Sequence, residues 1–113
     1  MNDVIFTVIS PLGYKISCSS KAMSHILSGH DIMRDNISAI MKTIQDPLAV
    51  YKSLLNEERD VYFSKCEATY FPLITKVVVQ INRQQMSGVI ISAWPQKEIN
   101  GGINKERILY AKL

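Results

Sequence analysis

The sequence predicts a single α+β domain over residues 1–113, with an N-terminal hairpin and two to three helices packed on a curved antiparallel β-sheet. Apolar residues make up 47% of the chain, which is enough to form one hydrophobic core between two layers. Helical periodicity is found only in the first half, and β-rich segments follow one another in the second half. Because short polar loops join these segments, an antiparallel meander is expected.

The chain begins with a predicted hairpin. Residues 4–9 are rich in β-branched and aromatic side chains, Pro11 to Gly13 supply turn residues, and residues 14–18 return as a second strand. Ser19 or Ser20 can then cap a helix over about residues 21–27. Gly29 is its expected end, because glycine reaches the left-handed conformation of many helix termini without steric cost.

A second helix is predicted to begin after Asp31 or Asp35. Its apolar residues follow the spacing of a helix with one buried face: Ile37, Ile40, Met41 and Ile44. The pair Asp46 and Pro47 ends it, because proline disfavours a helical residue before it. The same pair can cap a new helix, so residues 48–54 are expected to form a short third helix.

The second half is predicted to form the rest of the sheet. Residues 56–60 are a polar loop, and a glycine-containing polar stretch follows Pro95. Three strands and a final edge strand are expected at residues 61–66, 70–82, 88–94 and 107–113.

Alternation along the long strand separates two faces. One face is almost entirely apolar and is expected to meet the helices: Phe71, Leu73, Thr75, Val77, Val79 and Ile81. The other face carries Lys76, and Ser92 and Trp94 of the next strand can join it there. Such a face can receive a nucleotide, with the lysine on a phosphate, the serine as a hydrogen-bonding group and the ring stacked on a base. The alternative is an ordinary amphipathic sheet in which Trp94 fills a gap.

The two histidines of the chain are His25 and His30, and Arg34 follows four residues later. On one continuous helix, residues five apart point roughly 140° away from each other. A helix break at Gly29 would let the second ring turn back toward the first. Two imidazoles with pKa values of about 6.5 could then act as base and acid. The alternative is that each histidine is an ordinary cap, core or surface residue.

Composition excludes few functional classes. The net charge of +3 permits a polyanionic partner without requiring one. Cys18 and Cys66 match no zinc pattern and are expected to be reduced and buried. No signal peptide, no apolar run of the ~20 residues that span a membrane, and no phosphate-binding glycine loop are recognised. The cytoplasm is therefore the expected compartment, with no membrane, metal or cofactor.

Four segments resemble a known family over about residues 20–97: SHILSGHDIMRDNISAIMKTIQDPLAVYKS, VYFSK, ITKVVVQI and GVIISAWPQK. They are similar to small phage and mobile-element nuclease-like domains of the barnase–EndoU–colicin–RelE-like group. This resemblance implies an RNA-cleaving domain, often a toxin, that works without metal in the concavity of a sheet. His25 and His30 match the helical histidines of the family, and Ser92 matches a small hydroxyl residue of the late strand. Trp94 stands where tyrosine is more usual, which leaves stacking but no phenolic hydroxyl.

The predicted function is a metal-independent endoribonuclease, deployed as a toxin. The ribose 2′-OH would attack the adjacent phosphate to give a 2′,3′-cyclic product, with His25 and His30 as acid and base in either order. Arg34 and Lys76 would stabilise the phosphate charge, Ser92 would position it, and Trp94 would stack a base. The expected partners are RNA and a cognate antitoxin or immunity protein. The alternative is a non-catalytic RNA- or protein-binding module, either of the antitoxin or immunity type or a degenerate nuclease fold, with residues 107–113 as a partner surface.

Overall fold

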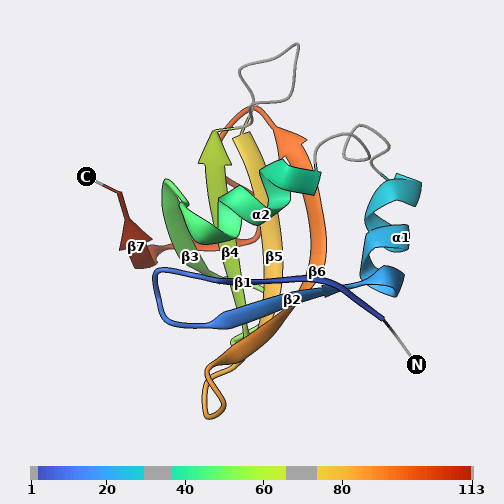
Figure 1. Ribbon diagram of the computed structural model, residues 1–113. Coiled ribbons are helices and arrows are strands. Elements are labelled where there is room, and N and C mark those ends of the chain that lie inside the picture. The colour runs from blue at the N-terminus through green and yellow to red at the C-terminus, as the bar shows by residue number, and fades with distance from the viewer. Residues whose placement is uncertain (1–2, 30–36, 66–73, 113) are drawn as a thin grey trace.

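The computed structural model describes residues 3–29, 37–65 and 74–112, which form one seven-stranded sheet and two helices (Figure 1). Strands account for 54% of these residues and helices for 20%. The strands lie in the order β1-β2-β6-β5-β4-β3-β7. Their bounds are β1 (Val4–Ile9), β2 (Lys15–Ser19), β3 (Ala49–Ser53), β4 (Arg59–Lys65), β5 (Ile74–Asn82), β6 (Ser87–Gln96) and β7 (Ile103–Ala111), and the helices are α1 (Ser20–Gly29) and α2 (Ile37–Gln45). Neither helix is long and apolar enough to cross a membrane.

The expected fold class was wrong in two respects, and the chain is α+β only in the broad sense. The sheet is mixed rather than antiparallel, because β2 pairs in parallel with β6 through partners such as Ser17 and Val89. Residues 48–54, expected as a short helix, contain strand β3, which pairs with β4 on one side and β7 on the other. Two rows of backbone hydrogen bonds thus override the local helix-start signal of Asp46 and Pro47.

The other elements follow the sequence more closely. β1 and β2 form the predicted antiparallel hairpin. The hydroxyl of Ser19 accepts a hydrogen bond from the backbone N–H of Ala22 at 3.0 Å, so Ser19 caps α1. Gly29 is the last residue of α1, as predicted. Its φ is not in the left-handed region, so the predicted left-handed glycine at the helix end is not observed. Strand β7 begins earlier than the predicted edge strand and does lie at an edge of the sheet.

The main core lies between the helices and one face of the sheet. Val77, Val79 and Ile81 belong to it, as alternation along the strand predicted. Helix α1 contributes Met23 and Ile26, and α2 contributes Ile40 and Ile44. The thiol of Cys18 also lies in this core, and its burial raises its pKa to about 11. Cys66 lies outside the described residues.

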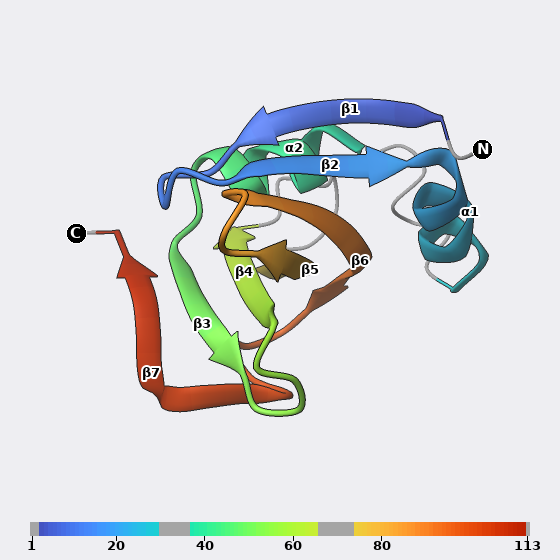
Figure 2. The ribbon, with the colours of Figure 1, turned by 90° about the horizontal axis from the view of Figure 1, so that it is seen from below.

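The opposite face of the sheet is only partly covered. The segment between β6 and β7 crosses it, and β7 bends before it reaches its place beside β3 (Figure 2). Beneath this cover lies a second cluster that includes Val61, Phe63, Ile99 and Ile103. The part of this face on β2, on the first half of β6 and on the end of β5 carries a groove instead.

Candidate functional site

Helix α1 packs beside strand β6, and the topology explains why. Strand β2 pairs with only the first part of β6, ending with Ser17 opposite Val89. The chain then enters α1 at Ser20. Because β2 and β6 run in the same direction, α1 passes along the later residues of β6, where β2 no longer lies (Figure 1). Helix α1, which contains His25, therefore lies beside the strand that carries Ser92 and Trp94.

His25 lies on the exposed side of α1. The residues that α1 buries are Met23 and Ile26, which contact the main core. The nearby hydrogen bond from the Ser28 hydroxyl, 2.9 Å long, goes to the backbone oxygen of His25 and not to its imidazole. His30 and Arg34 lie outside the described residues. The separation of the two imidazoles is thus not part of the described geometry.

Ser92, Trp94 and Lys76 share one face of the sheet. Lys76 pairs directly with Trp94, and Val78 pairs with Ser92. Directly opposed residues of an antiparallel pair point to the same side. The register shifts between Val78 and Val79, and this shift is a β-bulge. Because of the bulge, Ile90 points into the helix-side core, although it lies two residues from Ser92.

The shared face lies on the side of the sheet away from the helices. Val78 belongs to the second cluster, whereas its neighbours Val77 and Val79 contact the helix-side core. The Ser92 hydroxyl therefore lies on the face of the sheet opposite the core into which α1 buries Met23 and Ile26. The structure brings together Lys76, Ser92 and Trp94 but does not place His25 among them.

The ammonium of Lys76 is already occupied. The side chain is only 6% exposed. Its Nζ donates hydrogen bonds to the backbone oxygens of Gly101 at 2.6 Å and Asn100 at 3.3 Å, and it lies 4.8 Å from the centroid of the Trp94 ring. Gly101 has a φ of +85°, and a Cβ there would lie 3.0 Å from Nζ, so glycine allows this close approach. Lys76 thus holds the covering segment instead of presenting a free charge to phosphate.

Trp94 is tied to the same segment. Its Nε1 donates a hydrogen bond to Oε1 of Gln96 at 3.1 Å. The amide nitrogen of Gln96 in turn donates to the backbone oxygens of Glu98 at 2.6 Å and Asn100 at 2.9 Å. The half-buried indole is consequently held in a defined orientation at the border of the covered surface.

Replacing Lys76 with methionine is expected to remove a pH-dependent part of the stability. Burial lowers the pKa of Lys76 below its ordinary value of 10.5, so the unfolded chain binds more protons in the interval below 10.5. The free energy of unfolding contributed by this residue therefore rises with pH up to 10.5. Urea denaturation of both proteins at several alkaline pH values measures it. The wild-type value minus the variant value should increase with pH, and a constant difference would contradict the assignment.

Sequence reasoning missed a buried charge network at one end of the sheet. Asp60 is fully buried, and its Oδ1 accepts a hydrogen bond from Arg83 Nη2 at 2.9 Å. The Nζ of buried Lys52 lies 3.8 Å from the same oxygen. Arg83 Nη1 also donates to the Tyr14 hydroxyl at 2.7 Å. The sequence signal for this network is Lys52, a charged residue at an inward position of strand β3. This signal can be recognised only if residues 49–53 are predicted to form a strand.

No cluster of three or more His, Cys, Asp or Glu side chains suited to hold a metal ion occurs in the described ranges. Comparison of the chain with protein-family models, with curated proteins and with solved structures found no match.

Proposed function

We propose that the chain is a metal-independent endoribonuclease that acts as a toxin in the cytoplasm. The observation that carries the proposal is the packing of α1, which holds His25, along β6, which holds Ser92 and Trp94. These are two of the elements that the resemblance to nuclease-like domains covers. The substrate is RNA, and a cognate antitoxin or immunity protein is the partner that would cover the site.

In the proposed reaction, the RNA strand crosses the edge of β6 that β2 leaves unpaired. One histidine, His25 or His30, removes the proton of the ribose 2′-OH, and the oxygen attacks the adjacent phosphorus. The bond from phosphorus to the 5′-oxygen breaks, and the other histidine donates a proton to that leaving oxygen. The products are a 2′,3′-cyclic phosphate and a 5′-hydroxyl. No metal or cofactor takes part in this scheme.

The remaining residues have supporting roles in the proposal. Ser92 hydrogen-bonds the phosphate from the helix-free face, and Trp94 stacks on a base. Arg34 stabilises the negative charge at phosphorus. Lys76 acts through Trp94 and the covering segment, because its ammonium is engaged with backbone oxygens.

The test is cleavage of RNA by the purified protein, followed by mapping of the cut. An oligonucleotide with a single 2′-deoxy sugar at the mapped position should resist cleavage, and mass spectrometry should detect the cyclic phosphate on the RNA product. His25→Ala should lower the rate by about 10²–10⁴-fold. Ser24→Ala, at an exposed residue of the same helix, is the matched control and should retain the wild-type rate. Equal cleavage of the deoxy-substituted strand, or full activity of His25→Ala, would exclude the mechanism.

A second candidate function is a protein-binding module, which the free edge at β1 favours. This strand has the sequence VIFTVI, without any charge, and Val4, Ile5 and Ile9 are 59%, 47% and 56% exposed. Edge strands usually carry charges that prevent pairing with another chain. The opposite edge, β7, has such charges in the run from Lys105 to Arg107. Thus β1, rather than the predicted C-terminal strand, is the better surface for strand addition.

Expression separates the two candidates. Toxicity that His25→Ala relieves favours the ribonuclease. Harmless expression with intact cellular RNA favours the binding module. In that case the protein should associate with itself or with another chain in sedimentation experiments, and Ile9→Lys should reduce this association. The lysine would place a charge on the free edge without entering the core.

A further inference from the structure

The outer edge of β1 has backbone groups available for pairing with another strand. In the order of the described strands, β1 stands at one end, and Figure 2 shows no described segment on its outer side. Directly after β1, the backbone N–H of Ser10 donates to the backbone oxygen of Tyr14 across the hairpin at 2.9 Å. Because the backbone groups of an antiparallel pair alternate in direction along each strand, Thr7 and Ile9 direct theirs away from β2.

The side chains of β1 form a pattern that is symmetric about Thr7. Residues 5–9 have the sequence IFTVI, which carries no charge and has the same order of apolar and polar side chains in both directions. Val8 lies in the main core and Phe6 packs against it, so Thr7 points to the helix-free face. Thr7 is exposed, and its hydroxyl lies 3.0 Å from that of Ser17. The strand is therefore complementary to a copy of itself that runs in the opposite direction.

We infer that β1 pairs antiparallel with β1 of a second copy of this chain, with the two Thr7 residues directly opposite each other. In this register Phe6 of each copy lies opposite Val8 of the other, and apolar residues 5 and 9 oppose each other in the same way. The register shift between β1 and β2 lies between Val4 and Phe6, so the central pairs use the regular part of the strand. This assignment rests on the protein-binding candidate above, whose partner it identifies.

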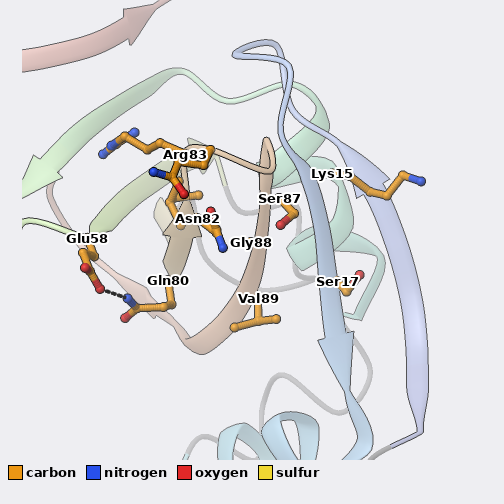
Figure 3. A pocket seen from close by; sticks show the side chains of 11 residues that line it. Lys15, Ser17, Glu58, Gln80, Asn82, Arg83, Ser87, Gly88 and Val89 are labelled. Carbon is orange, nitrogen blue, oxygen red and sulfur yellow. Dashed lines mark hydrogen bonds between the residues drawn. The ribbon is translucent and has the colours of Figure 1, made fainter.

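The position of Lys15 favours a register centred on Thr7. Lys15 pairs with Ile9 at the end of β1, and Figure 3 shows that its side chain points away from the groove on the helix-free face. In the proposed dimer Ile9 of one copy opposes Ile5 of the other, so the two Lys15 side chains belong to opposite ends of the interface. Four residues of strand span about 13 Å, which exceeds the ~8 Å screening length at physiological ionic strength. A register centred on Ile9 would instead bring the two ammonium groups close together.

The test is sedimentation of the full chain and of variants at Thr7. The wild type should show a monomer–dimer equilibrium at concentrations up to about 1 mM, because one short pair of edge strands is a small interface of the weak class. Thr7→Lys alone and Thr7→Glu alone should each remain monomeric, since like charges would lie directly opposite each other. An equimolar mixture of the two variants should restore the dimer. Lys105→Glu, at an exposed residue of the opposite edge strand β7, is the matched control and should associate like the wild type.

A second pair of variants tests the backbone hydrogen bonds. Thr7→Pro removes the N–H that points away from β2, so the hairpin keeps its own hydrogen bonds while the outer edge is blocked. Its dimer should be lost. Thr7→Val is the matched control, because it also removes the hydroxyl near Ser17 but keeps the N–H, and it should retain the dimer. If Thr7→Pro does not fold, the charge variants at the same exposed residue still decide the result.

Three results would overturn the inference: a wild type that is monomeric over the whole concentration range, undiminished association of Thr7→Lys, and a mixture of the charge variants that stays monomeric. A monomeric wild type that binds an unrelated chain through β1 refutes the second copy but leaves the protein-binding candidate intact. The ribonuclease is tested separately by RNA cleavage, because Thr7 has no role in its proposed site. Its failure would leave the dimer unaffected.

Discussion

Asp60→Asn is expected to lower the free energy of unfolding by about 3 kcal/mol, because it removes the carboxylate that two cations share. The Asp60 side chain is fully buried, and the Lys52 side chain beside it is 4% exposed. Without the negative charge, the Lys52 ammonium would remain buried near the Arg83 guanidinium. Breaking a fully buried ion pair costs about 3–5 kcal/mol, and the lower end applies because the Arg83 side chain is 42% exposed.

Urea denaturation of the wild type and Asp60→Asn measures this difference. Glu57→Gln is the matched control, because it also neutralises a carboxylate 3.8 Å from Lys52, but that side chain is 77% exposed. The control should cost less than about 1 kcal/mol, as exposed ion pairs usually do. If the two variants lose the same stability, the buried network is not a major contributor to the fold.

Gly88→Ala is expected to destabilise the protein by about 2–3 kcal/mol, the range for a methyl group forced into a tightly packed region. The new Cβ would lie 2.8 Å from the backbone oxygen of Gln80 and 2.9 Å from the Cδ1 atoms of Ile16 and Ile81. The oxygen belongs to the neighbouring strand β5, so it cannot move away without disturbing the β5–β6 pairing. Relief would require separating strands at the junction of β2, β5 and β6.

The same substitution at Gly29 is the control. A Cβ there comes within 4 Å of no neighbouring atom in the part of the chain that the structure describes, and the residue is helical. Alanine favours a helix over glycine, so Gly29→Ala should leave stability unchanged or raise it by up to about 1 kcal/mol. Thermal and urea unfolding of both variants provide the comparison. Equal effects at the two glycines would contradict the close approach of the strands at Gly88.

The chemistry of the candidate site was only partly readable in the sequence. Alternation placed Lys76, Ser92 and Trp94 on one face, and the β5–β6 register agrees. It did not indicate that the ammonium of Lys76 would be engaged by the backbone of Asn100 and Gly101, because these oxygens arrive from a later segment. A free charge and a charge held by two carbonyl groups look identical in a sequence.

The buried network and the groove were missed for a related reason. The helix that the sequence predicts over residues 48–54 includes Lys52, and a helix gives no indication that this side chain lies opposite Asp60 on a neighbouring strand. The predicted hairpin gives β2 one neighbouring strand, β1. It does not indicate that β6 lies on the other side of β2, where Lys15 pairs with Ser87. Each of these features depends on strands that are distant along the chain.

Local patterns by themselves determined the hairpin, a serine cap at residue 19 or 20, helix α2 and the alternation of the long strand. Neighbouring residues decide these features through turn geometry, hydrogen bonding of the first helical N–H groups and the spacing of apolar side chains. Only the tertiary structure decided that β2 joins β6 in parallel, that residues 49–53 form a strand, and that α1 lies along β6. The physical reason is that strand pairing satisfies backbone groups between segments far apart in the chain, and the apolar pattern of each segment is compatible with several partners.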